Sequence, residues 1–489
     1  MRNATEKSTD ALWKKDEKGK PACPLFGKCG GCRYLDLTYE QQLAKKQKLV
    51  RRLMEKHCRV KPILGMKDPW RYRHKVQAVF GLDRKKNPVS GVYEEKSHRL
   101  LLVESCLIED QKADEIIGTI RQMLRSFKIR IYDEDTGYGL FRYVMIRKGR
   151  FTGEIMVILV TASPMFPSRK NFVNALLKAH PEITTVVQNI NDRTDSMVLG
   201  ERFQTLYGKG YIMDELCGCR FKISPASFYQ VNPVQAAALY KKAVELAGLT
   251  GRETVVDAYC GTGTIGIIAS GKAGRVIGVE SNPEAVRDCV SNAKANGVKN
   301  IRFYRDDAGR FFKALAEEKS SVDVVLMDPP RAGSSREFLE ALGALGPKRI
   351  VYVSCNPETL ERDVTVLEKE GYRAEEVWPV DMFPWTAGVE AVCLLSKLKS
   401  TQHFSVEIAL DEVDITAAES KATYEEIKKY ILEKHGLKVS SLYVAQVKRK
   451  HGIVERSNYN TGEEKAKVSN VTPEKERAIE DALKHFKMI

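Results

Sequence analysis

Residues 223–398 alternate regularly between short apolar runs and longer amphipathic runs, and this alternation constrains the fold more than any other feature. The short runs are typical of buried strands, and the runs between them have the spacing of helices. Strands that alternate with helices of this length predict a mostly parallel, doubly wound α/β sheet. The strands are expected at 254–259, 276–280, 301–304, 322–327 and 350–354, and the helices at 263–270, 283–296, 337–345 and 358–369. A β-rich pair at 376–380 and 391–398 is expected to complete an edge.

The remaining chain divides by composition into three further parts. Residues 1–60 carry three clustered cysteines and then a basic helical run. Residues 61–222 mix short β-like runs with helical stretches, which predicts a separate α+β domain. Residues 401–489 contain three short amphipathic helical patterns and predict a small helical appendage. The basic end of the second pattern, Lys448-Arg449-Lys450, suggests a phosphate contact, although cations there can also simply complement the helix dipole.

Charge and hydropathy set the class of protein and of partner. Of the 489 residues, 43% are hydrophobic and 29% are charged, which is typical of globular domains. No stretch of about 18 apolar residues is present, and the N-terminus lacks the apolar core of a secretory signal, so we expect no membrane span and a cytoplasmic protein. The net charge of +15 favours a polyanionic partner, with a solvated basic surface as the alternative.

The turn after the first predicted strand of the sheet is rich in glycine, with the sequence Asp-Ala-Tyr-Cys-Gly-Thr-Gly over 257–263. Glycines let the backbone turn tightly, and the following helix offers free N–H groups to a ligand. The turn alone also fits a dinucleotide such as NAD. Two carboxylates favour S-adenosylmethionine (SAM) instead: Asp257 is placed to receive an ammonium group, and Glu280 ends the next strand, where it could accept the ribose hydroxyls.

Two other predicted strands end in chemically informative residues. Asp328 and two prolines follow the run at 322–327, and Arg331 stands where amino-group methyltransferases tend to have an aromatic residue. Cys355 follows the run at 350–354. Because open α/β sheets bind ligands at the carboxyl ends of their strands, Cys355 is predicted to be a nucleophile beside the cofactor rather than a core cysteine.

These motifs, in this order, resemble the SAM-dependent RNA uracil-C5 methyltransferases, specifically the iron–sulfur branch that acts on 23S ribosomal RNA. The resemblance covers about residues 20–398. It rests on Phe-Tyr-Gln-Val-Asn at 228–232, the glycine-rich turn at 257–263, Asp-Pro-Pro-Arg at 328–331 and Ser-Cys-Asn-Pro at 354–357. It implies a SAM-methyltransferase domain at 223–398 and a central RNA-binding domain at 61–222.

The resemblance also implies a reaction. Carbon 5 of uracil is a poor nucleophile until a thiolate adds to carbon 6, and the adduct must then lose its C5 proton to a base. Cys355 would be the nucleophile and Glu390 the base. The expected contacts to SAM come from Gln230, Tyr259, Glu280 and Asp328, with Asp257 added from its position.

The chain departs from the family in two places. The family usually has His two residues before the catalytic Glu, and this chain has Gly388 there, which affects how Glu390 is oriented. Many relatives also begin with a small β-barrel RNA-binding domain, and only 22 residues precede Cys23 here, so that module is expected to be absent.

Cys23, Cys29 and Cys32 lie within ten residues, separated by glycines that let the backbone fold around a ligand. Three thiols need a fourth ligand, and the spacing alone fits either zinc or an iron–sulfur cluster. The resemblance implies a [4Fe–4S] cluster, with Cys106 as the fourth ligand after the pair Ser97-His98. The cluster would join the N-terminal segment to the second domain.

Three alternatives to a 23S ribosomal RNA enzyme stay open from the sequence. A transfer RNA uracil-C5 methyltransferase has the same core motifs. An amino-group or small-molecule methyltransferase would leave Cys355 as core, and a non-catalytic RNA-binding assembly factor would use the same scaffold. Ribosomal RNA is the expected partner by resemblance, with no protein partner implied and the chain acting as a monomer.

Overall fold

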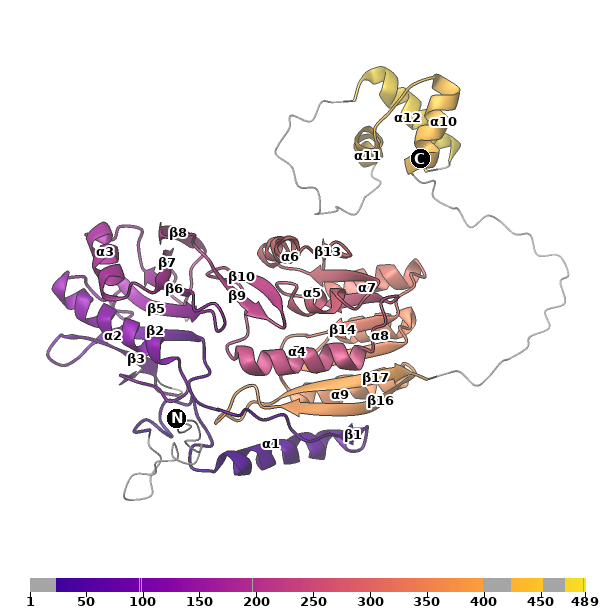
Figure 1. The fold of residues 1–489 in the computed structure, drawn as a ribbon. Helices are drawn as coiled ribbons and strands as arrows, with labels where there is room; N and C mark the ends of the chain where they lie inside the picture. Colours follow the sequence, from indigo (N-terminus) through magenta and orange to yellow (C-terminus); the bar gives the residue numbers. More distant parts are fainter. Residues whose placement is uncertain are drawn as a thin grey trace, which may run out of the picture. The chain divides into compact units, whose positions relative to one another are not determined.

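The computed structural model describes residues 23–95, 97, 99–195, 197–398, 424–451, 471–486 and 488–489. The chain forms two compact units, Met1–Leu398 and Lys399–Ile489. The first unit contains two large sheets, and the second contains helices (Figure 1). None of the helices in these described ranges is both long and apolar enough to cross a bilayer.

The larger sheet has eight strands in the order β1-β16-β17-β15-β14-β11-β12-β13. The five strands from β15 to β13 run parallel, as the strand–helix alternation predicts. The strands are β1 (Arg59–Val60), β11 (Thr254–Ala258), β12 (Arg275–Glu280), β13 (Ile301–Arg305), β14 (Val324–Met327), β15 (Arg349–Ser354), β16 (Tyr372–Val380) and β17 (Glu390–Lys397).

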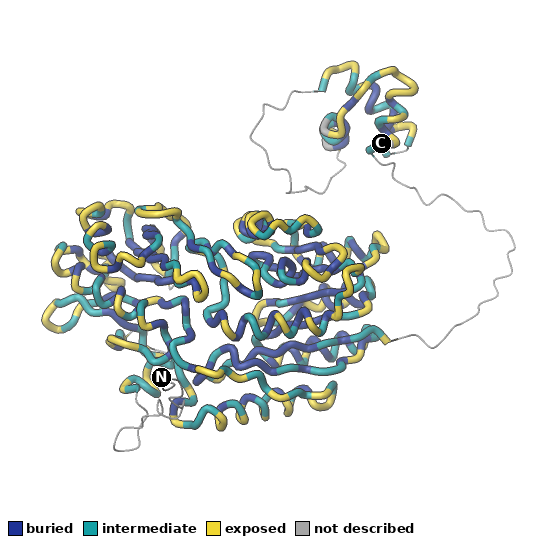
Figure 2. Tube along the Cα trace, viewed as in Figure 1, coloured by how far each residue is buried: buried dark blue, intermediate teal, exposed yellow. Residues whose placement is uncertain are grey.

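Helices cover both faces of this sheet, so its central strands are buried on both sides (Figures 1 and 2). Asparagine, aspartate or serine side chains accept backbone N–H groups at the start of several of these helices, which ends each preceding loop. The helices are α1 (Tyr39–Met54), α4 (Pro233–Ala247), α5 (Thr264–Ser270), α6 (Pro283–Ala295), α7 (Ala308–Glu317), α8 (Arg336–Leu345) and α9 (Pro357–Lys369).

The edge of the sheet differs from the prediction. The predicted pair, β16 and β17, is present, but β17 lies inside the sheet, antiparallel to both β15 and β16. The edge strand is β1, which comes from the N-terminal part of the chain and pairs in parallel with β16. Two residues are too few to produce a strand pattern in the sequence, so this strand is recognised only from its pairing with β16 in the structure.

The central sheet has seven mostly antiparallel strands, with α2 (Gln111–Ser126) and α3 (Arg169–Ala179) packed on one face. Its order is β4-β3-β2-β5-β6-β7-β8, and only β6 and β7 pair in parallel. The strands are β2 (Lys75–Leu82), β3 (Pro88–Tyr93), β4 (Leu100–Leu102), β5 (Phe141–Lys148), β6 (Ile155–Thr161), β7 (Ile183–Ile190) and β8 (Arg202–Tyr207). A separate hairpin of β9 (Ile212–Leu216) and β10 (Cys219–Ile223) follows. Residues of this hairpin belong to apolar clusters of both sheets.

The second unit contains α10 (Tyr424–His435), α11 (Ser441–Lys450) and α12 (Pro473–His485) around its own apolar core. Gly436, whose φ is +63°, follows α10 in the left-handed conformation typical of a glycine at a helix end. The sequence Thr-Tyr-Glu-Glu at 423–426 also predicts a helix cap at Thr423, which lies outside the described residues.

The basic end of α11 is engaged within the second unit. Lys448 is buried, with its Nζ 4.3 Å from the centre of the Tyr424 ring, and Lys450 forms an ion pair with Glu476. A buried or paired lysine is poorly placed to contact phosphate, so the positions of these two side chains do not favour the predicted phosphate contact.

Candidate active site

The carboxyl edge of the parallel strands gathers most of the predicted site residues. Asp257 is the second-last residue of β11, Asp328 directly follows β14, and Cys355 directly follows β15. Glu390 reaches the same edge because β17 is antiparallel: Ala391 pairs with Ser354, so β17 begins where β15 ends. The strand order therefore brings a thiol and a carboxyl together from positions 35 residues apart.

These residues line one cavity of about 500 Å³. Six of the seven predicted cofactor and catalytic residues belong to its wall: Gln230, Asp257, Tyr259, Asp328, Cys355 and Glu390. Glu280 does not belong to it, but its Oε2 accepts the backbone N–H of Gly261 at 3.1 Å and its Oε1 accepts that of Asn282 at 2.7 Å. Glu280 thus fixes the glycine-rich turn that forms part of the wall.

Three buried carboxyl groups share this cavity, and each has a raised pKa. Burial is the main cause, raising the pKa of Asp257 to about 8, that of Asp328 to about 7 and that of Glu390 to about 8. Repulsion from Asp328 adds to the shift at both Asp257 and Glu390. A site that holds three such groups favours a cationic ligand, because a positive charge offsets the cost of ionising them.

Asp257 has one oxygen engaged and one open. Its Oδ2 accepts the N–H of Gly266 at 2.8 Å, whereas its buried Oδ1 has no hydrogen-bond partner. A Cβ at Gly266 would come within 2.8 Å of Oδ2, so glycine allows the helix α5 to approach the carboxyl group this closely. Buried polar atoms are nearly always paired, so the open Oδ1 fits a donor such as the ammonium group of SAM.

The nucleophile candidate faces both a carboxyl group and a cation. The thiol of Cys355 is half-buried, and its pKa is raised by burial and by Glu390 and Asp328, while Arg331 lowers it. Arg331 also lowers the pKa of Glu390. The Arg331 carbonyl accepts hydrogen bonds at 3.4 Å from Asn356, the N-cap of α9, and from Thr359. The two strand ends that carry Arg331 and Cys355 are therefore tied together.

Comparison with known proteins gives this arrangement a family. A family model described as tRNA (Uracil-5-)-methyltransferase matches residues 213–398. Uncharacterized RNA methyltransferases of Halalkalibacterium halodurans and Clostridium acetobutylicum are 42% and 40% identical, over 76% and 81% of this chain and 82% and 87% of their own length. The chain belongs to the RNA uracil-C5 methyltransferase family. It is a SAM-dependent RNA methyltransferase.

A solved structure agrees with this assignment. The crystal structure of Pyrococcus abyssi tRNA (uracil-54, C5)-methyltransferase in complex with S-adenosyl-L-homocysteine is 29% identical and aligns with a TM-score of 0.62. The alignment covers 75% of this chain and 85% of that one. The predicted α/β methyltransferase fold and the predicted use of SAM are confirmed at this level.

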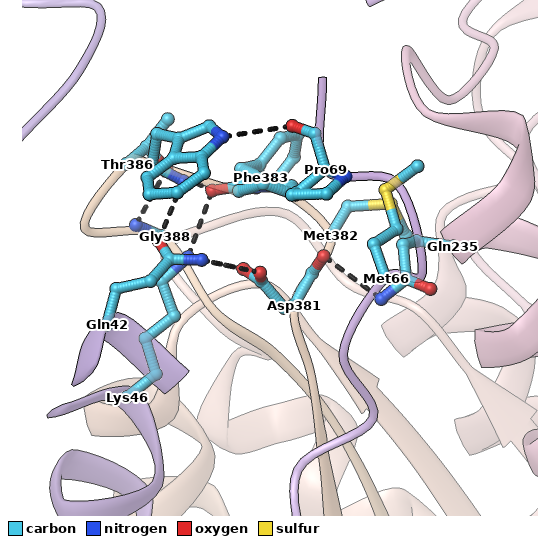
Figure 3. A network of polar contacts seen from close by, with 12 residues as sticks. Gln42, Lys46, Met66, Pro69, Gln235, Asp381, Met382, Phe383, Thr386 and Gly388 are labelled. Carbon is cyan, nitrogen blue, oxygen red and sulfur yellow. Dashed lines mark hydrogen bonds and ion pairs between the residues drawn. The ribbon is translucent and has the colours of Figure 1, made fainter. Parts of the chain in front are cut away.

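In this methyltransferase, the loop between β16 and Glu390 is held by a buried ion pair (Figure 3). Lys46 of α1 lies 2.5 Å from Oδ1 of Asp381, and both side chains are almost completely buried. Lys46 also donates to the carbonyl of Phe383 at 2.9 Å. Oδ2 of Asp381 accepts hydrogen bonds from Tyr39 at 2.8 Å and Gln42 at 3.0 Å. Three side chains, those of Tyr39, Gln42 and Lys46, thus converge on the first residues of the loop.

Other parts of the chain hold the rest of the loop. Asn232, at the end of the Phe-Tyr-Gln-Val-Asn motif, donates to the carbonyl of Met382 at 2.9 Å. The N–H groups of Arg33 and Tyr34 donate to the carbonyl of Trp385, whose φ of +67° is unusual for a bulky residue. The N-terminal segment therefore supports the stretch of chain that leads to the candidate base.

The four predicted cluster cysteines lie close together in the same region. Cys23, Cys32 and Cys106 pack against an apolar cluster that includes Trp385. Burial, together with the neighbouring thiols of Cys106, Cys29 and Cys23, raises the pKa of Cys32 to about 12. All four are free cysteines. Within the described residues, however, no three or more His, Cys, Asp or Glu side chains are arranged to hold a metal ion.

Sequence reasoning missed the residues that support the site. Lys46 looked like one of several cations in a solvated helix, and Asp381 had no motif. They are 335 residues apart, so no local pattern could pair them. Phe383, which also lines the cavity, could have been suspected from its place seven residues before Glu390.

Proposed function

We propose that this protein forms 5-methyluridine in 23S ribosomal RNA through a covalent adduct between Cys355 and carbon 6 of the target uracil. The proposal rests mainly on one observation: Cys355, Glu390 and the SAM-binding carboxyl groups line the same cavity. The alternative reaction, amino-group methylation, needs neither a thiol nor a second base at that position. Arg331 also occupies the place where such enzymes tend to stack an aromatic residue on the base.

The residues of the chain divide the reaction between them. The thiolate of Cys355 adds to C6, which places negative charge on the uracil ring and makes C5 nucleophilic. SAM, when bound, supplies the electrophilic methyl group that C5 takes. Glu390 then accepts the C5 proton, and the bond between Sγ and C6 breaks as the ring regains its double bond. Arg331 assists at both ends, because its charge favours the thiolate and the carboxylate.

Glu390 has to be ionised for this role, and burial opposes its ionisation. The positive charge of the bound cofactor acts in the same direction as Arg331 and lowers the pKa of nearby carboxyl groups. We therefore infer that the base becomes competent only when the cavity is loaded with cofactor. In the protein without cofactor, Glu390 would then stay protonated.

The choice of 23S ribosomal RNA over transfer RNA is a proposal that depends on the cysteine segment. Four free thiols, three of which pack against one apolar cluster, supply the soft sulfur ligands that a [4Fe–4S] cluster requires, and zinc would accept the same ligands. Cys23, Cys29, Cys32 and Cys106 would hold the cluster. A transfer RNA substrate is the second candidate, favoured by the 29% identity to the Pyrococcus abyssi enzyme. We also propose that the protein is monomeric and cytoplasmic.

Two substitutions test the mechanism. Cys355→Ala should lower methylation by several orders of magnitude while SAM still binds, because Cys355 is not among the residues expected to contact the cofactor. Glu390→Gln should transfer the methyl group and then stall, so that a protein–RNA adduct accumulates and survives denaturing gel electrophoresis. An active Cys355→Ala protein would refute the covalent mechanism. Mapping 5-methyluridine in 23S ribosomal RNA and transfer RNA of cells with and without the gene separates the two substrates.

A further inference from the structure

A groove in the central domain lies away from the catalytic cavity. It has a volume of about 1020 Å³ and is formed by the turn after α2, the segment before β5 and the segment that leads into α3. A smaller groove of about 360 Å³ adjoins it and shares Lys128, Arg130 and Tyr138. Strand β2 runs from Lys75, near Gln230 of the catalytic cavity, to Leu82 at the groove. Its eight residues span roughly 25 Å.

The lining of this double groove is basic and contains no acidic residue. Its charged members are six lysines and arginines: Lys86, Arg125, Lys128, Arg130, Arg169 and Lys170. Within the described residues, none of the six forms an ion pair; Arg169 instead donates to Gln204 at 3.0 Å. Six cations around one concave surface repel one another, and a polyanion relieves that repulsion.

Apolar and aromatic side chains stand among these cations. Tyr138 is 70% exposed, and the guanidinium of Arg130 lies 6.0 Å from the centre of its ring. Met165, on the opposite segment of the groove, is 81% exposed. An exposed aromatic ring beside arginines is the arrangement on which an unpaired base stacks while its phosphates meet the cations.

We propose that this double groove binds a single-stranded stretch of the RNA substrate, at a distance from the uridine that is methylated. This inference rests on the proposed function, since it takes RNA as the substrate. The protein would then bind its RNA at two sites. The catalytic cavity recognises the target base, and the groove recognises a second stretch of the same RNA. Long structured RNA would then bind more tightly than a short oligonucleotide.

The test uses the full chain and two RNAs, a long structured transcript of 23S ribosomal RNA and a short uridine-containing oligonucleotide. Arg130→Glu/Lys170→Glu should weaken binding of the transcript and make its salt dependence shallower by about 1.4 units of slope, since each neutralised phosphate of a single strand contributes about 0.7. Tyr138→Ala should weaken transcript binding by about fivefold or more without changing that slope, because it removes stacking and no charge. Methylation of the oligonucleotide should stay unchanged in both variants.

The matched control is Lys272→Glu/Arg275→Glu, which reverses two exposed cations beside the start of β12, at the edge opposite the catalytic cavity. It should bind the transcript like the unaltered protein; an equal loss in this control would show a general charge effect and overturn the proposal. Transcript binding that is unchanged in both groove variants would also overturn it, and would leave an acidic protein as the occupant to test. If the unaltered protein methylates neither RNA, the proposed function fails. The comparison of transcript binding between the variants still tests whether the groove binds RNA.

Discussion

Asp381→Asn is the substitution that most directly tests how the catalytic loop is held. It removes the negative charge that faces the buried ammonium of Lys46 at 2.5 Å and leaves that ammonium with the Phe383 carbonyl and a neutral amide. Breaking a buried pair in this way costs about 3–5 kcal/mol of unfolding free energy, because one charge stays buried without its partner. Lys46→Met should cost less, since the carboxylate keeps its donors Tyr39 and Gln42.

The pH dependence gives the prediction its sharpest form. Burial lowers the pKa of Lys46 below its usual 10.5, and Asp381 opposes that shift. Between the lowered pKa and 10.5 the unfolded chain binds more protons than the folded chain, so the unfolding free energy rises with pH in that window. Without Asp381 the pKa of Lys46 falls further, and the window extends to lower pH. The variant should therefore recover stability on going from neutral to alkaline pH more than the unaltered protein does.

Urea unfolding followed by tryptophan fluorescence is a suitable assay, because Trp385 lies in the same loop and is buried. The double variant Lys46→Met/Asp381→Asn should be less destabilised than the sum of the single variants, with a coupling of about 2–3 kcal/mol. Methylation should fall with Asp381→Asn, because the loop leads into Glu390. A cost below about 1 kcal/mol, combined with no recovery at alkaline pH, would refute the assigned role of this pair.

Three further outcomes are expected. The affinity for SAM should rise from about pH 6 to about pH 9, because the raised pKa values of Asp257, Asp328 and Glu390 leave these groups partly protonated in the empty cavity. SAM binding should therefore release protons, which calorimetry in two buffers can measure. Binding that is independent of pH would contradict this. Anaerobically purified protein should be brown and contain iron and sulfide, Cys29→Ser should lose both, and stoichiometric zinc without iron would exclude the cluster. Deleting residues 401–489 should leave methylation of a short RNA intact, whereas Lys448→Glu should lower the thermal stability of the second unit, because it places a carboxylate in a buried position.

The sequence predicted best what local patterns encode. The strand ends at Asp257, Asp328 and Cys355 follow from apolar runs that stop at polar residues, and the sheet order then had to bring them to one edge. The partners from distant segments could not be predicted this way. Strand β1 has two residues, and Lys46 has the pattern of a surface cation until Asp381 lies opposite it.

The position of β17 has a consequence for the synthesis of the protein. The turn at 257–263 and the strands that form the SAM-binding wall all precede β17 in the chain, whereas Glu390 is its first residue. A nascent chain that has left the ribosome only as far as Cys355 lacks both the base and the strand that pairs with β15. Because domains acquire structure as they emerge, such a chain has the nucleophile but not the means to complete the reaction. Catalytic competence therefore arrives with the last strand of the first unit.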